Sequence, residues 1–145
     1  MAAWYEQYVG KPWKGIPNPP DSYTCGELAR AVLRDQCGID APEILADAFS
    51  LRSCINAMRN PGYYGLRPLA PTEQPQQFDV VYLLRATMQD HVGIAVDSLD
   101  GLMIMHCQQG PGVTMGSIAE LHGLGFRHML WHRHVALDRG RPCPR

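Results

Sequence analysis

A proline-rich segment from Arg67 to Gln77 separates two halves of the chain that have different residue patterns. Proline lacks a backbone N–H and has a fixed φ, so neither a long helix nor a central strand is expected to run through this segment. Before it, apolar residues recur at helical spacing; after it, runs rich in β-branched and aromatic residues are separated by turn residues. Helices followed by strands favour an α+β fold, with N-terminal helices packed on a small antiparallel sheet.

Capping residues define two helical regions in the first half. Thr24 is a good N-cap, and Glu27, three residues later, completes the pattern of a capping box. The first helix is therefore predicted over residues 25–38, with a glycine as its C-cap. A second helical region is predicted over about residues 41–59, either unbroken or recapped at Ser50.

The second half has the pattern of a sheet. The Asp100-Gly101 pair between two apolar runs is a hairpin turn signal. A short helix with a further capping box is predicted to begin at Ser117. Strands are predicted over residues 78–85, 91–97, 102–108, 112–115 and 128–136.

The length and composition fit one globular domain. Of the 145 residues, 46% are hydrophobic and 19% are charged, so the chain has enough apolar surface for a core of its own. One domain is predicted over residues 1–137, and residues 138–145 are predicted to form an unpacked, flexible tail. The formal charge of -1 gives no basis for binding nucleic acid or an anionic membrane surface.

The sequence also bears on location and on the state of the cysteines. The N-terminus lacks the basic and apolar regions of a signal peptide, and no later run is long enough to span a membrane. The chain is therefore expected to be made and kept in the cytoplasm unless another factor exports it. Five cysteines at irregular spacing favour reduced thiols over a disulfide framework, and the Cys-x-x-Cys pair of a zinc ribbon is absent from the sequence.

Cys25 is the first candidate functional residue, because it falls at the predicted start of a helix. A thiol there is close to the positive end of the helix dipole and to unpaired backbone N–H groups. Both favour the thiolate, which is the nucleophilic form. The alternative is that Cys25 is a small buried apolar residue, as most free cysteines are.

Two histidines of the predicted hairpin offer a base for such a cysteine. His91 opens one strand and His106 lies late in the next, so antiparallel pairing places both at the same end of the sheet. By strand parity His91 shares a face with Gly93 and Ala95, whose small side chains leave room for the helix that begins at Cys25. A structural pair of hydrogen-bonded histidines is an equal alternative.

The order of these segments resembles the NlpC-type (NlpC and p-sixty) cell-wall cysteine peptidases, especially the branch found in phage tail tips. In both, an aromatic and proline-rich loop precedes a cysteine that opens a helix, and strands follow a linker. The resemblance extends from about Tyr8 to Trp131. Its most specific segments are Phe78-Asp79-Val80-Val81, similar to a Gly-Asp-Val-Val strand of the family, and His91-Val92-Gly93-Ile94, similar to its His-Val-Gly-Ile.

The resemblance implies a papain-like fold and a thiol peptidase, with Cys25 as nucleophile, His91 as base and His106 as the orienting residue. Members of the family hydrolyse peptide bonds in peptidoglycan stems, typically between D-glutamate and a diamino acid. For this chain the resemblance implies a phage tail-tip component of the virion, made in the host cytoplasm. Its partners would be stem peptides and other tail proteins, and no cofactor or metal ion is expected.

The chain departs from the family pattern around the cysteine. The position of the family's oxyanion-hole tyrosine is occupied by Trp13, whose indole N–H is a donor of different reach, and Tyr23 is an alternative donor. Thr24 and Glu27 stand where the family has Asp and Gly, and a carboxylate at Glu27 is expected to oppose thiolate formation. The second hypothesis is therefore a structural tail module of the same fold with a weakened or inactive site, which docks through its aromatic N-terminus and its C-terminus.

Three histidines of the last predicted strand offer a competing metal site. His128, His132 and His134 share one face of a strand, and a His-x-His pair has the spacing of zinc ligands. The preferred interpretation is a solvated strand face beside Arg127 and Arg133, with no metal. The remaining cysteines carry no partner signal and are interpreted as structural or incidental; they are Cys37, Cys54, Cys107 and Cys143.

Overall fold

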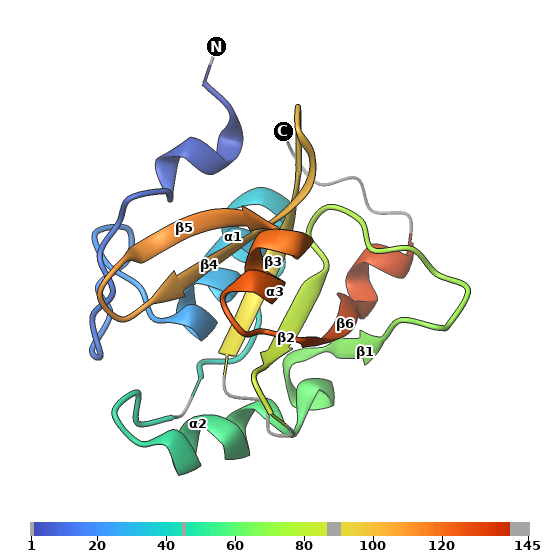
Figure 1. Ribbon diagram of the computed structural model, residues 1–145. Coiled ribbons are helices and arrows are strands. Elements are labelled where there is room, and N and C mark those ends of the chain that lie inside the picture. Colours follow the sequence, from blue (N-terminus) through green and yellow to red (C-terminus); the bar gives the residue numbers. More distant parts are fainter. Residues whose placement is uncertain (1, 45, 87–90, 140–145) are drawn as a thin grey trace.

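The computed structural model describes residues 2–44, 46–86 and 91–139 (Figure 1). Its α-helices are α1 (Cys25–Cys37), α2 (Leu51–Met58) and α3 (Ile118–Gly123). Its strands are β1 (Leu66–Pro68), β2 (Val80–Leu84), β3 (His91–Ser98), β4 (Gly101–Gln108), β5 (Gly112–Ser117) and β6 (His128–His134). Short 3-10 helices are η1 (Trp4–Gln7), η2 (Pro61–Tyr64) and η3 (Val135–Arg139).

Within the described residues the strands form one antiparallel six-stranded sheet in the order β1-β6-β2-β3-β4-β5. Helix α1 packs against β3 and β4 on one face of the sheet, and α3 lies on the other face beside β4 and β5 (Figure 1). The predicted α+β class is therefore confirmed. The five predicted strands are present as β2 to β6, with ends displaced by a few residues.

Helix α1 begins and ends where its capping residues predict. The Thr24 side chain accepts a hydrogen bond from the backbone N–H of Glu27 at 3.3 Å, and Gly38 at the C-cap has a φ of 65°, which favours glycine. The Glu27 carboxylate instead lies 3.3 Å from the guanidinium of Arg30. The predicted capping box is therefore half formed at α1, whereas the one at Ser117 is complete.

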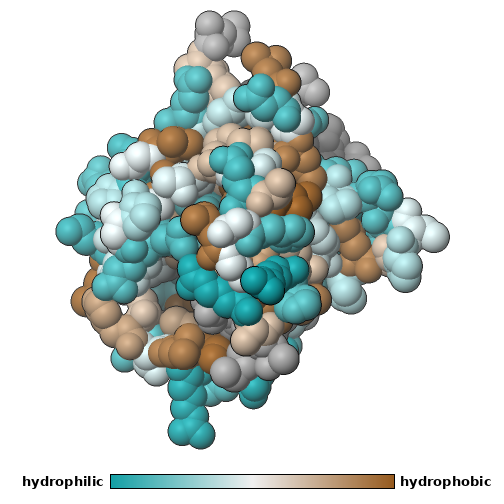
Figure 2. All heavy atoms as spheres, in the orientation of Figure 1, coloured by the Kyte–Doolittle hydropathy of each residue, from teal (hydrophilic) through white to brown (hydrophobic). Residues whose placement is uncertain are grey.

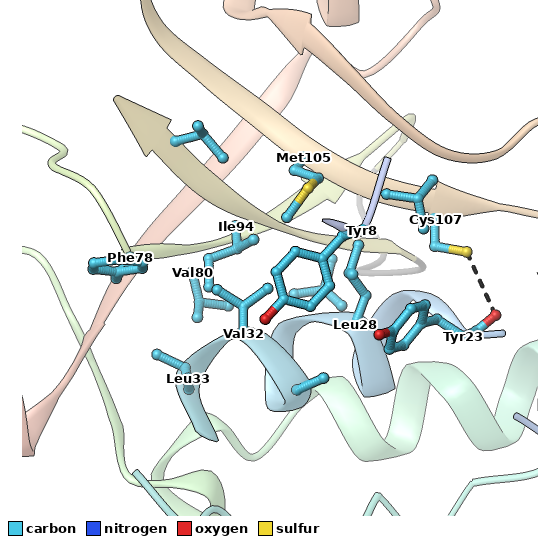
Figure 3. Packing of buried hydrophobic residues seen from close by; sticks show 14 of the residues in the cluster. Tyr8, Tyr23, Leu28, Val32, Leu33, Phe78, Val80, Ile94, Met105 and Cys107 are labelled. Carbon is cyan, nitrogen blue, oxygen red and sulfur yellow. Dashed lines mark hydrogen bonds between the residues drawn. The ribbon is translucent and has the colours of Figure 1, made fainter. Parts of the chain in front are cut away.

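The main core lies between α1 and the sheet. Leu28 and Val32 project from α1 toward Val80, Ile94 and Met105, and each of these five side chains is at most 2% exposed (Figure 3). Burying such a side chain stabilises a fold by roughly 1.5–3 kcal/mol. This contact therefore fixes the start of α1 relative to β3, which carries His91.

The prediction that α1 packs against the small residues of β3 is wrong. Val92 and Ile94 lie in the core cluster with α1. Ala95 pairs with Ile104, which packs against Phe126 in a second cluster on the opposite face. Larger apolar side chains give the helix more surface to bury, and hydrophobic stabilisation grows with that area.

The prediction of a helical region over residues 41–59 is correct only from Ser50 onward. The Ser50 side chain caps α2 by accepting from the backbone N–H of Ser53, while the described residues of 41–50 are not helical. The Ala41 carbonyl there accepts a hydrogen bond from Arg30 at 3.0 Å instead of a helical N–H. Tertiary contacts with α1 therefore override the local helical pattern.

The proline-rich segment contains neither a long helix nor a central strand, as predicted, and the first residue of the predicted tail is bound to it. The segment begins with strand β1, which pairs with β6 at the edge of the sheet. The Arg67 guanidinium lies 2.7 Å from Glu73 and 2.7 Å from Asp138. Asp138 is therefore tied to the domain, contrary to the prediction for the tail, and residues 140–145 lie outside the described part.

A buried ion pair joins the start of β2 to β6. Asp79 is 0% exposed, and its two carboxylate oxygens accept from Arg133 at 2.8 and 2.9 Å. The backbone N–H of Gln76 donates to the same carboxylate at 2.9 Å. This bidentate contact fixes the loop that leads into β2.

Polar and apolar side chains are interspersed over the face of the molecule in Figure 2. The aromatic N-terminus packs on the chain itself, since Tyr8 is 1% exposed and the Trp4 ring lies 5.1 Å from that of Phe78. Among the described residues, no helix has the length and apolar character that are needed to cross a membrane.

Candidate active site

Cys25 and His91 both line one cavity of about 1070 Å³. Cys25 is the first residue of α1 and His91 is the first residue of β3. Hydrogen bonding from the backbone of Val92 favours the Cys25 thiolate, so the sulfur lies against the start of β3. The Cys25 and His91 side chains therefore open into the same cavity, at the start of β3. They do so although α1 packs on the face of β3 opposite to the one that carries His91.

His91 and His106 form a close pair, as strand pairing predicts. Nε2 of His91 lies 2.9 Å from Nδ1 of His106, and the two residues are 8% and 1% exposed. Nδ1 is then the ring nitrogen of His91 that is left to accept a proton from another group. Nε2 of His106 lies 3.5 Å from the hydroxyl of Thr114 on β5, which suits an arrangement in which each histidine donates from Nε2.

Phe126 holds the plane of His91 and was not identified from the sequence. Its ring is stacked on that of His91, with a centroid distance of 5.3 Å and an interplanar angle of 19°. It also meets His106 edge-on at 6.3 Å. Phe126 lies between α3 and β6 outside any periodic pattern, so no sequence signal pointed to it or to Thr114.

Burial dominates the electrostatics of the Cys25 thiol. Although Cys25 is partly exposed as a residue, burial of its thiol raises the pKa to about 11. Hydrogen bonds from the backbone of Val92, Gly26 and Cys25 act in the opposite direction but are smaller. The predicted effect of the helix start is therefore present, and the desolvation of the charged form outweighs it.

The paired histidines are also kept neutral. Burial lowers the pKa of His91 to about 3, and electrostatic interaction with His106 and with the Arg85 charge acts in the same direction. Burial and Arg85 lower the pKa of His106 to about 4. The resting site therefore has an uncharged thiol and a neutral imidazole that open into one cavity. The His91 ring has a nitrogen able to accept a proton, but its lowered pKa makes it a weaker base than an ordinary histidine.

Of the three further candidate residues, the structure places two at the cavity and one in the core. Trp13 and Glu27 line the cavity with Cys25. The Tyr23 side chain is 1% exposed and packs in the core with Tyr8, at 6.1 Å between ring centroids, and it does not line the cavity. Burial is the largest cause of the raised pKa of Cys25, and Glu27, which was expected to oppose the thiolate, is not among the main causes.

Two cysteines that were interpreted as incidental lie beside the candidate site. Cys54 and Cys107 line the same cavity as Cys25. All three are free thiols. The Cys107 thiol donates to the Tyr23 carbonyl at 3.4 Å, and burial raises its pKa (Figure 3). Cys107 therefore helps to hold the residues before α1, and Cys143 lies outside the described part.

The prediction that the β6 histidines lie on a solvated strand face is wrong for His132, which is buried. His132 is buried edge-on against Tyr82 at 4.9 Å, and Nδ1 of His134 accepts from the backbone N–H of Ala136 at 3.1 Å. Within residues 2–44, 46–86 and 91–139, no group of three or more His, Cys, Asp or Glu residues could hold a metal ion.

The free energy of unfolding is expected to fall when the pH is lowered from 7 to 5. Unfolded histidine takes up a proton near pH 6.5, whereas His91 and His106 stay neutral in the folded state down to about pH 3 and about pH 4. Stability is therefore present above pH 6.5 and lost as the pH falls, on the order of 1–2 kcal/mol for each histidine by pH 5. Urea unfolding at the two pH values measures this.

The His106→Asn variant should lose less stability than the wild type over this pH range, because one buried titrating group is gone. His122→Gln is the matched control, since His122 is exposed, and it should keep the full pH dependence. A wild-type free energy of unfolding that does not change from pH 7 to pH 5 would contradict a neutral buried pair.

Comparison with known proteins gives no family for the chain: no family model matches it, and no curated protein gives a significant match. What the site does is therefore inferred from Cys25, the pair of His91 and His106, and the cavity beside them.

Proposed function

We propose that this protein is a cysteine peptidase of papain-like, NlpC type that hydrolyses peptide bonds in peptidoglycan stem peptides. Cys25 is the nucleophile, His91 the base and His106 the residue that orients His91. By its resemblance to the tail-tip branch of that family, the proposed setting is a phage tail component that opens the cell wall together with other tail proteins.

One observation carries the proposal. A thiol at a helix start and a histidine whose other ring nitrogen is bound by a second histidine open into the same cavity. A nucleophile, a base and an orienting partner are the three parts that thiol-dependent acyl transfer needs. The volume of about 1070 Å³ is sufficient for a short peptide.

The proposed reaction begins with a neutral pair. Nδ1 of His91 takes the proton of the Cys25 thiol as the sulfur attacks the scissile carbonyl carbon. His91 then gives this proton to the leaving amine, and a thioester remains on Cys25. Water, deprotonated by His91, hydrolyses the thioester and regenerates the thiol.

The oxyanion of the tetrahedral intermediate needs donors near Cys25. Backbone N–H groups in the first turn of α1 have no intrahelical partner, and their partial positive charge would stabilise an oxyanion. The Trp13 side chain lines the cavity, and we assign its indole N–H as the second donor.

A second candidate function is a structural tail module that keeps this fold without turnover. The observation that favours it is the Cys25 thiol, whose pKa is raised rather than lowered by its surroundings. The packed aromatic N-terminus weighs against docking through that segment, because Trp4 and Tyr8 are engaged with the chain's own core. Hydrolysis of a defined stem peptide, followed by mass spectrometry of the products, separates the two functions.

In that assay His91→Ala is expected to lower kcat roughly a hundredfold or more, because positioned proton transfer typically contributes that much. His106→Ala should lower it less, about tenfold, since water can replace part of the orienting contact. Melting temperatures of both variants check that the loss of activity is not caused by unfolding. Equal losses at the two positions would show that the roles of the histidines are assigned wrongly.

A further inference from the structure

Arg85 stands directly after β2 and lines the same cavity as Cys25 and His91. Its guanidinium carbon lies 4.3 Å from the centre of the Phe126 ring, a cation–π contact. Phe126 is in turn stacked on His91 at 5.3 Å. The three side chains therefore form one stack that places a fixed positive charge beside the proposed base.

Among the described residues, Arg85 is the arginine of this cavity that forms no ion pair. Of the other two arginines that line it, Arg30 lies 3.3 Å from Glu27 and Arg34 lies 3.0 Å from Asp35. Within the part of the chain that the structure describes, Arg85 has no carboxylate partner, and its charge is felt at the two buried histidines. An exposed guanidinium carries five N–H donors, and a ring contact uses none of them.

The Arg85 side chain, although exposed, also lies against a second neighbour besides Phe126. It passes Gly125, where an added Cβ would lie 3.8 Å from Nε of Arg85. Gly125 has a φ of 100°, which lets the chain turn directly into Phe126. The guanidinium is thus oriented before any ligand arrives, so little rotamer entropy is lost when an anion binds.

We propose that Arg85 binds a free carboxylate of the substrate and makes the site selective for peptides that carry one next to the scissile bond. A planar guanidinium on an aromatic ring is suited to bidentate recognition of a carboxylate. The inference rests on the proposed peptidase function and names the substrate class within it. A stem peptide that is linked through the side-chain carboxyl of D-glutamate has such a carboxylate, and its amidated form does not.

The test compares two stem peptides that differ only in this group, the D-glutamate carboxylate and its carboxamide. Wild type should have a higher kcat/KM for the carboxylate peptide. Arg85→Gln should lower kcat/KM for that peptide roughly ten- to a hundredfold and leave the carboxamide peptide almost unchanged, because the lost hydrogen bonds are to a charged group. Arg127→Gln is the matched control, since Arg127 is exposed and does not line the cavity, and it should change neither value.

Two outcomes of this comparison overturn the proposal. If Arg85→Gln lowers kcat/KM equally for both peptides, Arg85 acts by positioning Phe126 and His91 rather than by binding a carboxylate. If Arg85→Gln leaves kcat/KM unchanged for both peptides, Arg85 has no role in substrate recognition. If the wild type hydrolyses neither peptide, the proposed function itself is refuted. Whether Arg85 binds a carboxylate is then decided by a measurement that needs no hydrolysis.

That measurement is the alkylation of Cys25 by iodoacetate and by iodoacetamide, followed by peptide mass spectrometry. Both reagents need the same thiolate, so the ratio of their rate constants is independent of the pKa of Cys25. Arg85→Gln should lower the iodoacetate to iodoacetamide ratio several-fold, since it removes the charge that attracts the anionic reagent. A ratio equal to that of the wild type overturns the carboxylate site.

Discussion

Replacing Cys25 with alanine is expected to lower the rate of stem-peptide hydrolysis by roughly a thousandfold or more, because the variant has no nucleophile. The fold should persist, since Thr24 and the core contacts of Leu28 and Val32 that hold the start of α1 are untouched. Product formation measured by mass spectrometry, beside a melting curve of each protein, checks both parts of this expectation.

Cys54→Ala is the matched control, because its thiol lines the same cavity without a place in the proposed reaction. It should retain most of the activity. Full activity in the Cys25→Ala variant would remove the nucleophile assignment, and a loss as large in Cys54→Ala would show that a thiol on α2 takes part.

Asp79→Ala is expected to lower the free energy of unfolding by about 3–5 kcal/mol. The substitution leaves the guanidinium of Arg133 without its bidentate partner, at a side chain that is 10% exposed. It also removes the acceptor for the Gln76 backbone N–H. Urea unfolding of the wild type and the variant measures the difference.

Asp97→Ala is the control for this effect, because the Asp97 side chain is exposed on β3. It should change the free energy of unfolding by less than about 0.5 kcal/mol. A loss of under 1 kcal/mol in Asp79→Ala would mean that Glu73, which already lies 3.0 Å from the Arg133 guanidinium, is sufficient to balance its charge.

Local patterns in the sequence predicted much of the fold. The start of α1 depends on Thr24 and its end on Gly38, and both caps act within a few residues of the chain. The same is true of the turn at Asp100-Gly101, which set the register of β3 and β4 and so the 2.9 Å contact of His91 with His106.

The errors came from contacts between distant segments. The region 41–50 has a helical pattern, yet the Ala41 carbonyl accepts a hydrogen bond from the Arg30 side chain of α1 instead of from a helical N–H. Strand parity placed Gly93 with His91 on one face correctly, but which face the helix covers is set by the area that Ile94 and its neighbours bury.

The site was predicted in its residue types more than in its electrostatics. The sequence pointed to Cys25 because backbone N–H groups at a helix start favour a thiolate, and those groups do lower its pKa. The burial that raises the pKa to about 11 depends on the walls of the cavity, which come from segments far apart in the chain. Arg85 and Phe126 were missed for the same reason, since their role exists only in the folded stack on His91.

The most direct measurement is the set of muropeptides released when the purified protein is incubated with intact sacculi. The proposed function predicts new stem-peptide fragments, each ending at a hydrolysed peptide bond, from the wild type and none from Cys25→Ala. Sacculi that yield the same muropeptides with and without the wild-type protein would contradict the peptidase assignment and leave the structural tail module as the remaining proposal.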